Sequence, residues 1–143
     1  MFRGSRDGDR TKKCHQMCDN KKNILIIIKS DSGNIFGGYC KIGFKRCSKS
    51  EYKIDNNSFL FSNNLRKIYP AINNSFPICH INDSYGLCFS ASLNICDCFM
   101  SISKSKVCAG DCEKYFSGLT KNYEMNGGYR FFKCVELEVF QLI

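Results

Sequence analysis

Short segments rich in β-branched and aromatic residues recur along the chain, separated by turns rich in asparagine, serine and glycine. The clearest pair is 24–29 and 35–40, which flank the turn sequence Asp31-Ser32-Gly33-Asn34. A strand, a glycine-containing turn and a second strand predict a β-hairpin. Further strands are expected at 58–62, 65–72, 76–81, 87–90 and 129–140.

A helix is expected over 8–20, where Asp9 or Thr11 could cap the first turn. Cys14, Met17 and Cys18 would form a narrow apolar stripe on it, and residues 97–128 predict mostly loop. Many short strands at spacings of roughly 8–12 residues, with few helices, favour an antiparallel sandwich. We therefore expect one domain over 1–143 of α+β, mainly β class: a two-sheet antiparallel β-sandwich with one or two flanking short helices.

The last strand alternates in polarity. Its expected faces are Val135, Leu137 and Val139 on one side, and Cys134, Glu136, Glu138 and Phe140 on the other. The two carboxylates would be solvated or matched to basic residues of a partner strand. Gly37 and Gly38 lie inside a strand, so they indicate either a bulge or a close approach of two backbones.

The chain carries 21 lysines and arginines against 13 aspartates and glutamates, a formal charge of +8. Residues 1–60 hold 13 basic against 6 acidic residues, scattered in ones and twos. Such a distribution predicts a solvated basic surface and no specific nucleic-acid binding. The longest apolar run, 24–28, is far shorter than the roughly 20 residues of a membrane span. The N-terminus has no apolar signal segment, so we expect a soluble, cytoplasmic protein.

Eleven cysteines at irregular spacings argue against a disulfide framework and favour reduced, buried thiols. Three pairs have spacings that a metal could use: Cys14 with Cys18, Cys96 with Cys98, and Cys108 with Cys112. None belongs to a paired C-x2-C arrangement, and core packing also explains the first pair. We therefore expect no structural metal and no cofactor.

Sequence motifs of a nucleophile elbow, a phosphate loop or a dinucleotide fold are absent. Of the two histidines, His15 is expected at the surface of the helix. His80 directly follows Cys79, and adjacent strand residues point to opposite faces, which disfavours a cysteine–histidine dyad. These observations predict a protein that is not an enzyme.

Four segments together resemble the TLDc domain, the domain of the oxidation-resistance proteins. They are 2–8 (FRGSRDG), 33–39 (GNIFGGY), 57–62 (NSFLFS) and 135–140 (VELEVF), and they follow the order and spacing of the family. The resemblance implies a sandwich of two antiparallel sheets with flanking helices and no established catalytic centre. It also implies binding to the peripheral sector of the vacuolar proton pump, the V-ATPase, and a role in the oxidative stress response.

The matching signature positions are Arg6, Asp7, Gly8, Gly37, Gly38, Phe59, Phe61 and Glu138. Among them the glycines and phenylalanines are expected to serve the fold, and the charged residues are the candidate polar contacts.

The chain departs from the family at three places. The strand and helix that normally precede the first motif are missing, Asp9-Arg10 replaces Phe-Ser, and Phe140 stands where the family has tryptophan. It thus resembles a divergent, N-terminally short paralogue of protozoan type. Two alternatives to the pump-binding module remain: a redox-responsive, cysteine-rich thiol protein, and an adaptor domain of a larger assembly.

Overall fold

The computed structural model describes residues 1–107 and 112–143. In chain order its elements are β1 (Phe2–Arg3), α1 (Gly4–Asp7), α2 (Thr11–Cys18), β2 (Ile24–Ser30), β3 (Ile35–Cys40), β4 (Glu51–Lys53), β5 (Phe59–Ser62), β6 (Lys67–Pro70), β7 (Ile78–His80), β8 (Tyr85–Phe89), β9 (Leu93–Cys96), β10 (Ser105–Val107), η1 (Cys112–Lys114), η2 (Glu124–Asn126), β11 (Phe131–Phe132) and β12 (Cys134–Gln141). The labels α and η mark α-helices and 3-10 helices.

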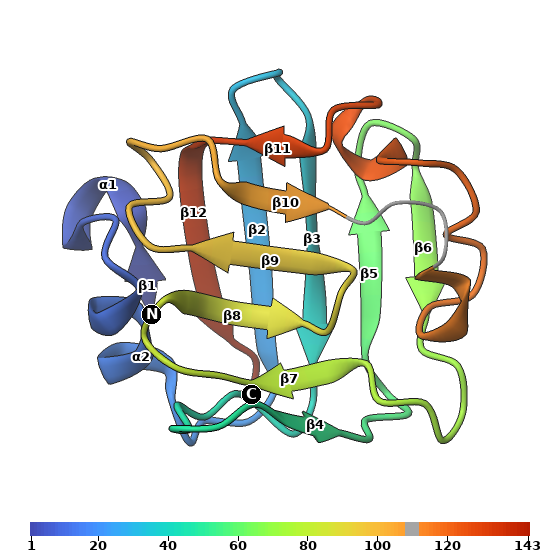
Figure 1. Ribbon diagram of the computed structural model, residues 1–143, viewed down its shortest axis with the longest axis horizontal. Coiled ribbons are helices and arrows are strands. Elements are labelled where there is room, and N and C mark those ends of the chain that lie inside the picture. Colours follow the sequence, from blue (N-terminus) through green and yellow to red (C-terminus); the bar gives the residue numbers. More distant parts are fainter. Residues whose placement is uncertain (108–111) are drawn as a thin grey trace.

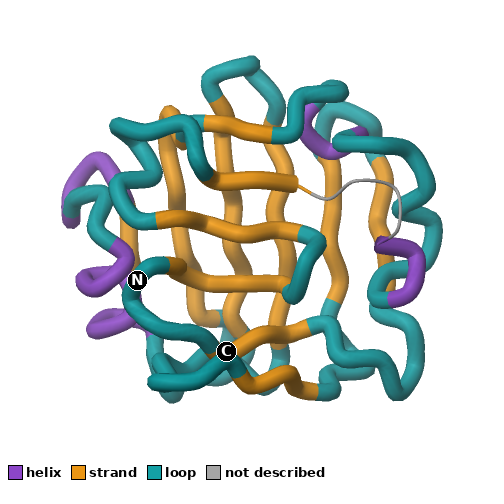
Figure 2. The backbone as a smooth tube through the Cα atoms, viewed as in Figure 1, coloured by secondary structure: helices purple, strands orange, loops and turns teal. Residues whose placement is uncertain are grey.

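The strands form two antiparallel sheets of six. Sheet A has the order β1-β12-β2-β3-β5-β6, and sheet B has the order β11-β10-β9-β8-β7-β4. In Figure 1 the strands of sheet B run across those of sheet A, which lies behind them. Figure 2 shows the two longer helices beside the sheets, at one edge of the sandwich. The predicted fold class, a mainly β two-sheet sandwich with short flanking helices, is confirmed.

The predicted hairpin is present as β2 and β3, which pair from Ile24 with Cys40 to Lys29 with Ile35. Alternation along β2 places the side chains of Ile24, Ile26 and Ile28 in the core between the sheets, fully buried. The inner faces of both sheets contribute to this core, with Phe36 and Leu60 from sheet A and Leu87, Phe89 and Ile95 from sheet B.

The predicted helix is shorter than expected, and a separate turn of helix, α1, precedes it. Neither Asp9 nor Thr11 provides a side-chain cap, because Arg10 occupies the N-cap position of α2. The free backbone amide of Thr11 is instead satisfied by the residue that follows β9, because Oδ1 of Asp97 accepts its hydrogen bond at 2.8 Å. The apolar stripe is confirmed, since Cys14 and Cys18 are fully buried.

The expectation that His15 lies at the surface is wrong, because the residue is 3% exposed. Its Nε2 donates to the carbonyl of Tyr85 at 2.8 Å, and its Nδ1 lies 2.7 Å from Oδ1 of Asp19. The imidazole therefore ties α2 to β8. Burial disfavours its charged form, but the bonds to Asp19 and to Tyr85 outweigh burial and raise the pKa of His15.

The predicted alternation of the last strand holds only in part. Leu137 and Val139 face the core, and Glu138 and Phe140 face outward. A shift in register between Cys134 and Glu136 interrupts the pairing of β12 with β2. Because this bulge adds one residue, Cys134 is buried and Val135 is 51% exposed, the reverse of the prediction for those two positions.

Other strand predictions differ in their ends. The segment 65–72 contains β6, 76–81 contains β7, and 87–90 overlaps β8. The segment 129–140 was predicted as one strand, but it is divided between β11 of sheet B and β12 of sheet A. The short strands β1, β4, β9 and β10 were not predicted, because each has only two to four residues and includes a polar one. Within the described part, 97–128 is mostly loop, as predicted. None of the helices described has the length and apolar character required to span a bilayer.

Candidate functional site

The outward side of sheet A is lined by apolar side chains. Pairing registers place directly opposite residues on the same side of a sheet, so one row runs across all six strands: Arg3, Glu138, Ile27, Gly37, Phe61 and Ile68. A neighbouring row contains Phe140, Leu25, Tyr39, Phe59 and Pro70. We use the name apolar outer face for eight residues of this side: Leu25, Ile27, Ile35, Tyr39, Phe59, Phe61, Ile68 and Phe140.

The apolar outer face is accessible to a partner. Ile68 is 65% exposed and Phe140 is 38% exposed, and the other six side chains are partly exposed. Its aromatic part is ordered by stacking of Tyr39 on Phe59, with ring centroids 5.3 Å apart. Helices α1 and α2 lie beside the sheets in Figure 1, so they do not cover this side. A connected apolar surface of this kind is typical of an interaction site.

The signature glycines at 37 and 38 serve opposite sides of sheet A. At Gly37 a Cβ atom would lie 1.9 Å from the carbonyl oxygen of Ile26 and 3.0 Å from the ring of Phe61. At Gly38 it would lie 2.6 Å from the ring of Phe89, in the core. Pairing of β2 with β3 continues through both positions without a register shift, so the glycines mark close approaches and not a bulge.

The charged signature residues lie at the edge of sheet A where β1 pairs with β12. Arg6 forms an ion pair with Asp7 at 2.7 Å, and Oδ2 of Asp7 accepts the backbone N–H of Arg3 at 2.9 Å. The bond from Arg6, followed by that from Arg3, lowers the pKa of Asp7 to about 2. Gly8 ends α1 with φ at +92°, a left-handed conformation that favours glycine. Arg6 and Asp7 are therefore partners of each other and not of Glu138.

Glu138 instead forms an ion pair with Arg3, its direct neighbour across β1 and β12. This outcome fits one of the two expected environments, a carboxylate matched to a basic residue of a partner strand. Arg3 is not among the residues predicted from the sequence, although it stands within the first TLDc-like segment. Glu136 fills a different role, because its Oε1 accepts the backbone N–H of Ser5 at 3.0 Å and so anchors α1.

The signature set consequently separates into three places. Gly37, Phe59 and Phe61 belong to the outward side of sheet A, and Gly38 belongs to the core. Arg6, Asp7 and Gly8 shape the turn after β1, whereas Glu138 stands in the same row as Gly37 and Phe61. The TLDc-like segments point to these residues, but only the registers of the sheet show which of them share a face.

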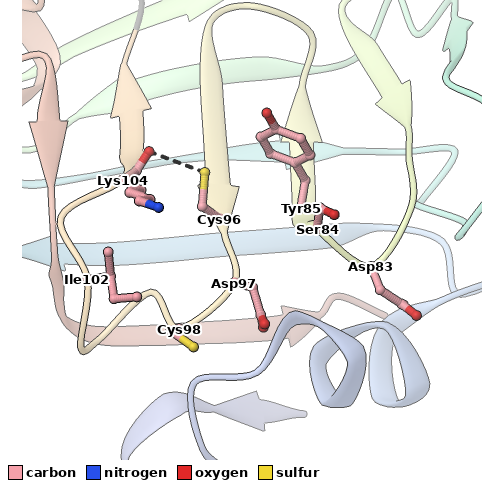
Figure 3. A pocket seen from close by; sticks show the side chains of 8 residues that line it. All are labelled: Asp83, Ser84, Tyr85, Cys96, Asp97, Cys98, Ile102 and Lys104. Atoms are coloured by element: carbon pink, nitrogen blue, oxygen red, sulfur yellow. Dashed lines mark hydrogen bonds between the residues drawn. The ribbon is translucent and has the colours of Figure 1, made fainter.

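A cavity of about 540 Å³ opens beside α2, where β8 begins and β9 ends (Figure 3). Three of its polar groups are already engaged: Asp97 pairs with Arg10 at 2.8 Å, Asp83 pairs with Arg46 at 3.1 Å, and Sγ of Cys96 donates to the carbonyl of Lys104 at 3.2 Å. Burial raises the pKa of the Cys96 thiol, which disfavours a reactive thiolate. The carboxylate of Asp97, through its bonds to Arg10 and Thr11, thus attaches the start of α2 to the end of β9.

Most of the described cysteines are structural. Those that are buried, as expected for small apolar residues, are Cys14, Cys18, Cys40, Cys79, Cys88 and Cys134. Burial raises the pKa of the Cys40 and Cys134 thiols well above the ordinary range. The predicted pair Cys108 with Cys112 lies outside the residues whose side chains are described.

Within residues 1–107 and 112–143, neither Cys14 with Cys18 nor Cys96 with Cys98 belongs to a group of three metal-ligating side chains. Such a group is formed by Cys47, Glu51 and His80, a combination that was not predicted from the sequence. The group was not predicted because His80 lies far along the chain from Cys47 and Glu51, and because the three residues follow no known metal-binding spacing.

Comparison with known proteins supports the resemblance carried by the four segments. No curated protein matches the chain at a significant level. The family model of the TLDc domain matches residues 1–143, from the first strand to the last. This match spans the chain, and the chain therefore belongs to the TLDc domain family.

Proposed function

We propose that this TLDc domain is a non-enzymatic protein-interaction module that binds the peripheral sector of the V-ATPase from the cytosol. Through this contact it contributes to resistance to oxidative stress. Family membership supports the choice of partner. The observation that carries the proposal is the apolar outer face of sheet A.

The chemistry of this face suits a protein partner. A sheet surface offers a broad and shallow contact, and aromatic side chains such as Tyr39, Phe59 and Phe61 are enriched at the centres of protein interfaces. The Arg3–Glu138 ion pair lies at one end of the same row and supplies a polar rim. The cavity beside α2, in contrast, has both of its carboxylates engaged in ion pairs, Asp97 with Arg10 and Asp83 with Arg46, which favours binding over catalysis.

The binding test compares two variants with the same substitution. Ile68→Lys places a charge on the apolar outer face at a position that is 65% exposed. Ile102→Lys is the matched control, because Ile102 is 41% exposed and lines the cavity beside sheet B. Neither change introduces a charge into the core, so both variants should fold, which thermal melts will verify.

We expect wild-type protein and Ile102→Lys to bind the isolated peripheral sector with equal affinity. Ile68→Lys should bind at least about tenfold more weakly, which corresponds to a loss of roughly 1.4 kcal/mol in binding free energy. Surface plasmon resonance measures these affinities. The basic excess of residues 1–60 should also make association weaken as salt is raised. Failure of the wild type to bind at micromolar concentration contradicts the proposal, and equal binding of all three proteins contradicts the assigned face.

A further inference from the structure

A cysteine, a glutamate and a histidine converge at the edge of sheet B. Sγ of Cys47, a carboxylate oxygen of Glu51 and a ring nitrogen of His80 all lie within 4.8 Å of one another. Glu51 and His80 are directly opposite residues in the pairing of β4 with β7. The backbone N–H of Cys47 donates to the carbonyl of Ile81 at 3.1 Å, which holds the loop before β4 against the end of β7.

The histidine presents one bare nitrogen. Nε2 of His80 donates to the carbonyl of Gly43 at 3.3 Å, so in the neutral ring Nδ1 carries a lone pair and no proton. Nδ1 is buried and has no hydrogen-bond partner in the described part of the structure. A buried acceptor without a partner costs stability, and a bound cation would remove that cost. A ligating histidine whose other nitrogen donates to a backbone carbonyl is the usual arrangement at metal sites.

The remaining ligands are available. Glu51 pairs with Lys53 at 3.2 Å, but both side chains are about half exposed, so that ion pair is weak and readily replaced. Cys47 is half-buried and unpaired with another cysteine.

We propose that Cys47, Glu51 and His80 bind one Zn²⁺ ion, with water as the fourth ligand. A thiolate, an imidazole and a carboxylate match the ligands that zinc takes, whereas calcium and magnesium require oxygen. On binding, the Cys47 thiol releases its proton to solvent and its sulfur donates an electron pair to the metal. The ion would join the 41–50 loop to sheet B. This site differs from the sequence-based expectation of no metal, which rested on the lack of paired C-x2-C motifs.

The experiment titrates Zn²⁺ into the reduced, chelator-treated chain in competition with a chromophoric chelator. Cys47→Ser, Glu51→Gln and His80→Gln each remove one ligand, and Cys96→Ser is the control for a half-buried cysteine elsewhere. We expect wild type and Cys96→Ser to bind one ion with equal affinity. We expect the three ligand variants to bind it more than about tenfold more weakly, since even outer-shell changes cost 10–100-fold. Zinc should also raise the melting temperature of wild type but not of Cys47→Ser.

Cobalt provides a second readout that does not depend on folding of the His80 variant. The Co²⁺ complex of wild type should show a thiolate-to-cobalt charge-transfer band, and Cys47→Ser should lack it. The proposal is overturned if Cys47→Ser and Glu51→Gln bind zinc as tightly as wild type. It is also overturned if the charge-transfer band persists without Cys47, because the metal would then occupy other cysteines.

Discussion

Alanine substitutions at three glycines measure how closely the strands approach one another. Gly38→Ala would place Cβ 2.6 Å from Cζ of Phe89 and 2.8 Å from Cδ2 of Leu60, two fully buried side chains. Gly37→Ala would place it 1.9 Å from the carbonyl oxygen of Ile26, a backbone atom of β2. Gly86→Ala is the control, because its nearest neighbour would be a methyl group at 3.3 Å.

The expected losses of stability follow from which atoms must move. Replacing glycine with alanine by itself stabilises by about 0.4–1 kcal/mol through the unfolded chain. Overpacking a core costs about 1–3 kcal/mol, so Gly38→Ala should lower the free energy of unfolding by about 1–2 kcal/mol. At Gly37 no side-chain rotation relieves the contact and two strands must separate, so the loss should exceed about 3 kcal/mol. Gly86→Ala should change stability by less than about 1 kcal/mol.

Urea denaturation followed by circular dichroism measures the three free energies of unfolding. The predicted order of destabilisation is Gly37 over Gly38 over Gly86. If Gly37→Ala is as stable as Gly86→Ala, then Gly37 is not a site of close backbone approach. The row that joins Glu138 to Phe61 through Gly37 would then be placed incorrectly, and with it the apolar outer face.

Three further predictions concern titration and thiol reactivity. Asp7→Asn should remove a stabilisation that is present above pH 3.8 and is lost as pH falls toward the native pKa of about 2, measured by urea midpoints across that range. A flat pH response in the wild type would contradict it. His15→Gln should remove a stabilisation that is present below pH 6.5 and is lost as pH rises, since the native pKa of His15 is raised. Thermal melts at several pH values measure this stabilisation, and a wild type that gains stability from pH 6 to 8 would refute the prediction. Among the nine cysteines whose side chains are described, iodoacetamide should modify Cys47, Cys96 and Cys98 of the native protein before the six that are buried. Mass spectrometry that shows early modification of Cys14 or Cys134 would disprove their burial.

The sequence predicted those parts of the fold that local signals determine. The run 24–28 is apolar at every position, which predicts a strand with apolar residues on both sides, and the turn at 31–34 sets its partner. Short strands such as β9 and β10 escaped prediction because three or four residues with polar members carry little periodic signal. The bulge after Cys134 likewise has no local sequence signal, yet it places Cys134 in the core and Val135 at the surface, the reverse of the predicted alternation.

Sites that depend on several strands were less predictable. The resemblance identified Phe61 and Glu138, but their common row follows from the registers of three pairings that no local motif encodes. Cys47 and His80 meet because β4 pairs with β7, an edge pairing that no local sequence signal predicts. Arg3 was overlooked for the same reason, because its role derives from pairing with β12.

Hydroxyl-radical footprinting of the domain, alone and bound to the isolated peripheral sector of the V-ATPase, tests the central claim most directly. Aromatic side chains report on solvent access on both sides of the sandwich. We predict that complex formation protects Phe59, Phe61 and Phe140 of the apolar outer face. Labelling of Tyr52 and Phe131, which are 55% and 49% exposed on sheet B, should stay unchanged. Protection of Tyr52 and Phe131 with unchanged labelling of sheet A would contradict the account.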